Sequence, residues 1–460
     1  MLSALLLPER AWAHAHLKRS EPAAGAQLAA PPRVIRLWFS EQPELSMTFA
    51  SLIDSAGKAF ALSSADREDS GQMAIAFSVL AALPAGHYTL TWRTAASDGH
   101  PSQGKFSFVV ANRPASALAL PLAGHANGAN SMGPSLSPVA PALPGNVTDP
   151  DKDDSDAAGS LGNLLARGLL FVGVLALIGA VSFKVFVLGR AGAVSLELKG
   201  RMTRRAATLG IVSAALVIVV ALVRLGLESQ MMSAMPDMPG MQGMTVREMV
   251  VQTDWGFAFR LQVAAAIAAL AAFVLALRRV RGAWFVAGGS ALVLAITPAL
   301  GGHAAASSRF TSLMIAGDWL HVLGGASWLG SLLFVMMIGV PIALTLEPPD
   351  SWSSISSLVN AFSPVALVSA AVVVASGVFA SWVHLEHLSA LWQTNYGRTL
   401  LVKLALVLIT LAIGAYNFKR VQPQLSNETG TLRLRRSAAA ELGVGFLILL
   451  VTGLLTGISP

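Results

Sequence analysis

The chain has 460 residues, of which 54% are hydrophobic and only 12% are charged, and its formal net charge is +7. Soluble domains carry about 25% charged residues, so this composition excludes a wholly soluble protein and is typical of a membrane protein. The sequence contains 0 cysteines. Disulfides are therefore excluded, and any metal site must use histidine, methionine, carboxylate or amine ligands.

The first residues resemble a secretory signal. A short apolar run at 2–7 precedes the cleavage pattern Ala11-Trp12-Ala13, which predicts a signal peptide over residues 1–13. Cleavage would leave His14 with a free α-amine beside its imidazole, and such a pair of nitrogens suits Cu(II) in tetragonal geometry. His16 follows two residues later. The alternative is that His14 and His16 are solvated histidines at a frayed terminus.

Residues 14–111 are expected to form a soluble all-β domain. Short runs of alternating apolar residues, separated by turn residues, predict strands at this spacing. The pattern favours a β-sandwich or a β-barrel. The runs lie at 34–39, 47–53, 73–79, 88–92 and 106–110.

Asp98-Gly99-His100 is a second candidate metal half-site in this region. Side chains two residues apart share a side of an extended chain, so the carboxylate and the imidazole can point the same way. Asp-Gly is also a common turn signal, which is the alternative reading of the motif. Glu41 follows the run at 34–39 and could add a carboxylate, whereas His87 is expected at the surface.

A flexible linker is predicted over residues 112–158, which are rich in Pro, Ala, Gly, Ser and Asn and include His125. Residues 159–460 are expected to form an all-α membrane domain. Eight apolar segments are long enough to cross about 30 Å of hydrocarbon as helices. They lie near 161–189, 206–227, 255–277, 283–301, 313–339, 362–384, 397–417 and 439–458.

The basic residues between these segments are strongly asymmetric. If the β domain is exported, the outer loops carry Arg247 and Arg309, and the inner loops carry the rest. The positive-inside rule then predicts a bacterial inner-membrane protein with its β domain and C-terminus in the periplasm. The inner set consists of Arg190, Lys199, Arg201, Arg204, Arg205, Arg278, Arg279, Arg281, Lys419, Arg420, Arg433, Arg435 and Arg436.

Ionisable residues inside apolar segments are costly and so indicate function. Asp318 and His321 are three residues apart, share one helix face with Met314, and lie near the outer mouth. Such a row could receive copper, since thioethers suit Cu(I) and imidazole suits either oxidation state. The alternative is that Asp318 pairs with Lys403 or Arg260 and holds the spans together.

The predicted outer loops carry further candidate ligands. Residues 231–244 contain six methionines among Pro and Gly, a composition that favours Cu(I) capture over an interfacial contact. The candidates in these loops are Met238, Met241, Met244, His303, His384 and His387.

Several of these motifs resemble a known family. The segments 14–26, 37–41, 88–93, 97–101 and 104–108 follow, in order and spacing, the pattern of the periplasmic copper-binding CopC family. The resemblance implies a Greek-key β-barrel. It also implies a Cu(II) site made by the amine and ring of His14 with Asp98 and His100. Glu41 matches a nearby family glutamate, and His16 matches a family histidine.

The C-terminal part resembles a second family. Gly302-His303, the stretch 317–330 (GDWLHVLGGASWLG) and the segment 396–417 are similar to the CopD family of eight-span inner-membrane copper proteins. This resemblance implies copper movement across the membrane, with import to the cytoplasm as the direction generally assumed. Fusion of the two domains in one chain is itself a known arrangement.

We therefore expect periplasmic copper binding and copper transport across the inner membrane, with uptake favoured, in copper homeostasis and resistance. Copper ions, the lipid bilayer and other periplasmic copper proteins are the expected partners, and no nucleic acid is. Sequestration or delivery without transport is the alternative. No catalytic residues are expected, because Asp98 would fill the position that an oxygen-activating copper centre leaves open. A bis-histidine haem is disfavoured, since His321 and His384 both lie near the outer surface.

Overall fold

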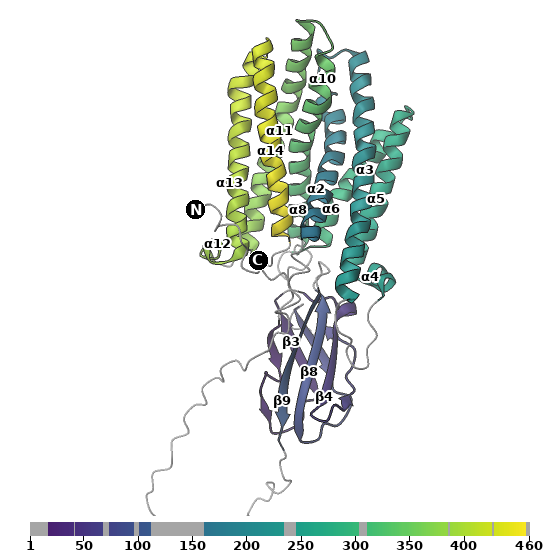
Figure 1. Ribbon diagram of the computed structural model, residues 1–460, viewed down its shortest axis with the longest axis vertical. Helices are drawn as coiled ribbons and strands as arrows, with labels where there is room; N and C mark the ends of the chain where they lie inside the picture. The colour runs from purple at the N-terminus through teal and green to yellow at the C-terminus, as the bar shows by residue number, and fades with distance from the viewer. Residues whose placement is uncertain are drawn as a thin grey trace, which may run out of the picture.

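The computed structural model describes residues 17–40, 42–67, 73–95, 101–111, 161–233, 245–302, 311–384, 387–425 and 427–456. It contains a β-sandwich followed by a bundle of long helices (Figure 1). The expected two-part architecture, all-β and then all-α, is therefore confirmed.

The sandwich consists of two sheets. One has the strand order β1-β3-β7-β6 and the other the order β2-β9-β8-β4-β5. The strands are β1 (Leu17–Glu21), β2 (Gln27–Leu28), β3 (Val34–Phe39), β4 (Phe49–Asp54), β5 (Ala59–Phe60), β6 (Asp66–Arg67), β7 (Ala74–Ser78), β8 (Gly86–Ala95) and β9 (Pro101–Val110).

Alternation of side chains explains how the sandwich fills its core. In β3, Ile35, Leu37 and Phe39 are at most 1% exposed, while the residues between them are half-buried. The ring of Phe39 meets that of Trp92 edge-on, with centroids 5.2 Å apart. The five expected strands are present, and β8 and β9 are longer than predicted. The sequence pattern did not reveal β1, β2, β5 and β6, which are short or polar edge strands.

The helical part has eight helices long and apolar enough to cross a membrane within the described residues. Their bounds are Gly162–Val187, Leu196–Gln230, Asp254–Leu277, Ala283–Leu300, Thr311–Ala343, Asp350–Val383, Asn395–Gln424 and Glu428–Leu455. In the labels of Figure 1, they correspond to α2, α3, α5, α6, the run α8–α10, α11, α13 and α14.

Three of these helices begin well before the predicted spans. The helices α3, α11 and α14 start at Leu196, Asp350 and Glu428, whereas the sequence predicted 206, 362 and 439. The reason is that hydropathy detects only the part of a helix that suits hydrocarbon. The polar first turns of a helix stay helical in water, and in α14 they carry Arg433, Arg435 and Arg436.

Small residues allow the helices to pack closely at the centre of the bundle. A Cβ on Gly179 of α2 would lie 2.6 Å from the Cα of Gly330, which ends the π-helical turn η5 (Ala326–Gly330) of the fifth span. The two backbones are therefore in direct contact, which is how membrane helices without large side chains associate.

Gly104 provides a test of the sandwich core. A Cβ at this position would lie 2.6 Å from Cζ2 of Trp92, which is 2% exposed. We expect Gly104→Ala to destabilise the β domain by about 1–3 kcal/mol, because overpacking forces the indole from its rotamer. Hydrogen–deuterium exchange of β8 and β9 peptides in the full chain measures this.

Gly86→Ala is the matched control, since its Cβ would lie 4.0 Å from Cε2 of Tyr88, an ordinary contact. Equal protection of the strands in both variants would contradict the prediction.

Candidate functional site

The β-domain ligands predicted from the sequence are His14, His16, Glu41, Asp98 and His100, and all five lie outside the described residues. The residues that border them are described, and they lie at one end of the sandwich. Leu17, at the start of β1, pairs with Phe39 at the end of β3. Ala95 and Pro101, on either side of residues 96–100, pair with each other.

Glu44 joins these two borders. Its backbone N–H donates to the carbonyl of Ala95 at 2.8 Å, so the chain that leaves β3 returns to the end of β8. The described residues that border 14–16, 41 and 96–100 therefore all lie at the same end of the domain. His87 is exposed, as expected.

The same glutamate contacts the membrane domain. Both carboxylate oxygens of Glu44 accept from the backbone N–H of Asp254, the first residue of α5, at 3.3 Å. A carboxylate at a helix N-terminus is stabilised by the unpaired N–H groups and the helix dipole. Thr253 caps the same helix by accepting from the N–H of Gly256 at 2.8 Å. The end of the sandwich that borders the predicted ligands thus faces the helix bundle (Figure 1).

Burial and the neighbouring Asp254 carboxylate raise the pKa of Glu44 above its ordinary value of 4.5. The hydrogen bonds from Asp254 and Ser46 and the charge of Arg67 act in the opposite direction but are weaker. The docked state consequently binds the Glu44 proton more tightly than a state in which Glu44 is solvated and far from Asp254.

A cluster of polar side chains lies near the end of the bundle that faces the β domain. Asp318 and His321 are on α8 (Thr311–Gly325), and Ser376 is on α11 (Asp350–His384). Tyr396 and Lys403 are on α13 (Asn395–Tyr416). Lys403 interacts electrostatically with both His321 and Asp318, and Asp318 also interacts with Tyr396. Asp318 thus interacts electrostatically with Lys403, one of the two partners in the sequence-based alternative, whereas the other, Arg260, is exposed on α5.

The hydrogen bonds of Ser376 assign one tautomer to its neighbour His321. Its Nδ1 lies 3.0 Å from Oγ of Ser376, and that hydroxyl lies 2.7 Å from the carbonyl of Val372, to which it donates. Because the hydroxyl has one proton, Nδ1–H of His321 is the donor to Ser376. Nε2 then keeps its lone pair, which is the atom a neutral histidine offers to a metal.

The other membrane-domain candidates are less concentrated. Met314 is 1% exposed in a small apolar cluster with Ala299 and Phe379. His387 is exposed after α11. His384 ends α11, but its side chain is outside the described part, as are His303, Met238, Met241 and Met244. Within the described ranges, no group of three or more His, Asp or Glu side chains could hold a metal ion.

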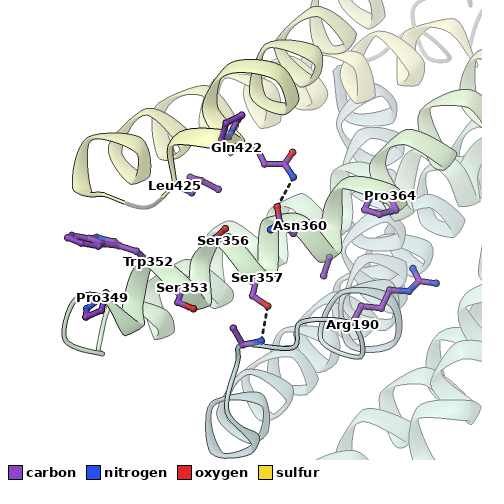
Figure 2. A pocket seen from close by; sticks show the side chains of 13 residues that line it. Arg190, Pro349, Trp352, Ser353, Ser356, Ser357, Asn360, Pro364, Gln422 and Leu425 are labelled. Carbon is purple, nitrogen blue, oxygen red and sulfur yellow. Dashed lines mark hydrogen bonds between the residues drawn. The ribbon is translucent and has the colours of Figure 1, made fainter.

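A cavity of about 680 Å³ opens at the opposite end of the bundle (Figure 2). Asn360 of α11 accepts from Nε2 of Gln422 at 2.7 Å across it. Ser357 accepts from the N–H of Ala193 at 3.1 Å. The lining has a single charged residue, Arg190, and no carboxylate, so the cavity is polar but unlike a metal site.

One buried carboxylate was not found from the sequence. Glu441 of α14 (Glu428–Leu455) is 2% exposed and accepts from Trp328 and Asn417. The signal was available, since Glu441 is an acidic residue within an apolar stretch. The span predicted at 439–458 includes this residue near its start, but the ionisable residues singled out from the sequence do not include it.

Family comparisons agree with the two-part structure. The CopC domain model matches residues 17–111. The model of the copper resistance protein D-like N-terminal domain matches residues 156–310, and that of copper resistance protein D matches residues 356–455. The chain is a CopC–CopD fusion of the copper resistance families.

Relatives cover either the whole fusion or its β part. The copper transport protein CutJ of Bacillus subtilis is 23% identical over 100% of this chain and 76% of its own length. Protein YobA of Escherichia coli is 33% identical over 24% of this chain and 89% of its own length. The crystal structure of PcoC, a methionine-rich copper resistance protein from Escherichia coli, is 30% identical. It covers 21% of this chain and 98% of its own, with a TM-score of 0.20.

The Glu44 contact predicts pH-dependent docking. A raised pKa means that the docked state binds more protons, so docking is strongest at low pH and weakens as pH rises through the pKa of docked Glu44. Glu44→Gln should remove this dependence. Because the chain has 0 cysteines, a spin-label pair on introduced cysteines in β4 and α4 (Val246–Gln252) can report the interdomain distance.

Glu21→Gln is the control, since that carboxylate makes a surface ion pair with Arg36 at 3.6 Å within the β domain. A distance distribution with the same pH profile in the wild-type chain and Glu44→Gln would contradict the assignment.

Proposed function

We propose that this chain captures Cu(II) in the periplasm at its β domain and conducts copper through its helical domain toward the cytoplasm. The observation that carries the proposal is the Glu44–Asp254 contact. It turns the end of the sandwich that borders the predicted ligands toward the helix bundle. The Asp318 and His321 cluster lies near that same end of the bundle.

The orientation is supported by charge. Arg190, Arg278 and Lys419 lie at helix ends opposite the β domain, as the positive-inside rule requires of the cytoplasmic side. CutJ, which matches this chain over its whole length, is named a copper transport protein, and this name supports copper as the transported ion.

The proposed route begins at the predicted ligands His14, Asp98 and His100, with Glu41 and His16 beside them. The tether raises the effective copper concentration at the bundle, because the two domains share one chain. The lone pair of His321 Nε2 is the proposed first ligand of the bundle, with the Asp318 carboxylate beside it. The methionines within residues 231–244 are the proposed ligands for copper that reaches the protein already reduced, as Cu(I).

We propose no catalytic turnover. The support is the donor set implied for the β domain, in which Asp98 occupies a copper position that an oxygen-activating centre would leave open. Sequestration or delivery without transport is the second candidate function. It would need only the β domain, which matches the CopC domain model at residues 17–111.

Cellular copper content tests the transport claim. Cells that express the protein should accumulate more copper than cells lacking its gene, as measured by elemental mass spectrometry. His321→Ala and Asp318→Ala should abolish the difference. Ser376→Ala should weaken copper binding by the bundle about 10- to 100-fold, as expected for loss of a group that orients a ligand.

Ser381→Ala is the matched control, since Ser381 donates to the Gly377 carbonyl of its own helix at 2.8 Å. Equal copper in cells with and without the gene would exclude transport. Copper tolerance that survives Asp318→Ala and His321→Ala but is lost in His100→Ala would favour sequestration.

The N-terminus provides a separate test of copper capture. Sequencing of the mature protein should find His14 first, and the free amine should then serve as a ligand. A variant that retains Ala13 should bind Cu(II) more weakly in a titration of the full chain, because its first amine is displaced from the imidazole of His14. Equal affinity of the two forms would exclude the amine as a ligand.

A further inference from the structure

Glu441 is a carboxylate held inside the helix bundle by two donors. Oε1 accepts from Nε1 of Trp328 at 3.0 Å, and Oε2 accepts from Nδ2 of Asn417 at 2.9 Å. Trp328 lies in the π-helical turn η5 of the fifth span, and Asn417 begins the π-helical turn η7 (Asn417–Val421) after α13. Such turns occur often at functional sites because they displace a side chain from the regular helical face.

A purely structural carboxylate would be an unusual choice here. Bringing an ionised group into a membrane domain costs free energy, and apolar side chains would join three helices without that cost. Gly414 packs beside the group, since a Cβ there would be in ordinary contact with Oε1 of Glu441, at 3.6 Å.

The interactions of Glu441 among the described residues are the two hydrogen bonds, and its electrostatic environment includes no resolved charged partner. Charged and titratable groups do occur on its own helix and on four of the elements packed against it, which are α2, α11, α13 and η7. They are Glu428, Arg433, Arg435 and Arg436 on α14, Arg167 on α2, Asp350 and His384 on α11, Tyr396, Arg398, Lys403 and Tyr416 on α13, and Lys419 and Arg420 on η7. The other two packed elements, α9 (Ser331–Phe334) and η8 (Gln422–Gln424), carry none.

Asn417 can serve both protonation states of the carboxyl. Its Nδ2 now donates to the carboxylate, while its Oδ1 is buried with no hydrogen-bond partner among the described residues. If Glu441 gains a proton, rotation of the amide lets Oδ1 accept from the new O–H. The indole of Trp328 donates to the other oxygen in either state. Asn417 can therefore pair with the carboxyl group in either protonation state.

Glu441 also lies between the two polar ends of the bundle. Trp328 follows His321 by seven residues, about two helical turns, on the fifth span. Asn417 begins the π-helical turn whose end adjoins Gln422, a residue of the inner cavity. Gln422 accepts from Ser363 at 3.2 Å and donates to Asn360. Glu441 therefore lies along the bundle between the outer cluster and the inner cavity.

We propose that Glu441 is a proton-binding site of the membrane domain and that its proton is released to, or taken from, the inner cavity as copper passes. The link to copper rests on the proposed function. The proton-binding site itself does not. No redox step is involved: an O–H bond forms or breaks at one carboxylate oxygen, and water in the cavity supplies or accepts the proton.

Infrared difference spectroscopy of the purified full chain tests the site directly. As the pH is lowered, carbonyl stretches of protonated carboxylic acids should appear in the wild-type chain, and one component of this band should be missing in Glu441→Gln. Glutamine is a suitable replacement, because its oxygen can accept from Trp328 and its amide can donate to Oδ1 of Asn417. Glu228→Gln is the matched control, since Glu228 is also buried, at 4% exposure on α3 (Leu196–Ser233).

The site is overturned if the pH-dependent band is identical in the wild-type chain and Glu441→Gln, or if Glu228→Gln removes it instead. Should Glu441→Gln fail to fold, Asn417→Ala keeps the carboxyl and should shift the pH at which the band appears. An unchanged pH would overturn the role of Asn417 in serving both states.

Proteoliposomes test the link to copper. Addition of Cu(I) to one side should move protons in the wild-type chain, as reported by a pH-sensitive dye, and Glu441→Gln should lose this movement. Copper flux without proton movement would overturn the link. Absence of copper flux from the wild-type chain would instead refute the proposed function, while the infrared titration would still decide whether Glu441 binds the proton.

Discussion

The hydrocarbon interior of a bilayer offers no hydrogen-bond partner, and this constraint governs most of the structure. Each of the eight long helices satisfies its own backbone, so the spans are read from hydropathy and length. Several polar side chains between the helices are paired with one another. His321 meets Ser376, Gln422 meets Asn360, and Glu441 meets Trp328 and Asn417. Oδ1 of Asn417 is buried without a hydrogen-bond partner among the described residues, and the proposed rotation of the amide would give it one.

The residues of these polar sets all belong to the last four spans. The fifth span contributes His321 and Trp328, and its backbone changes from α to π geometry at Ala326. The seventh span contributes Lys403 and, at its π-helical end, Asn417. The arrangement separates the bundle into a scaffold packed through small residues, such as Gly179 against Gly330, and a polar line that the proposed transport would use.

The two domains meet through a contact of a different kind. Glu44 binds a helix N-terminus, which carries unpaired N–H groups at any pH, through a carboxylate whose charge depends on pH. The contact is small and polar, so it orients the β domain without requiring a large apolar interface. The contact lies beside the chain segments that carry the predicted copper ligands. The proposed transfer of copper therefore runs from these ligands toward the helix bundle.

Local pattern was sufficient for the fold class. Alternation predicted the strand at Val34–Phe39, and apolar length predicted all eight spans, because both depend on neighbours within one element. Motifs also indicated the candidate ligands, of which Asp318 and His321 are brought beside Lys403, while the β-domain set stays a prediction. Tertiary structure alone decided the roles of Glu44 and Glu441. Their partners Asp254 and Trp328 are 210 and 113 residues away in the chain, so only the folded protein brings donor and acceptor together.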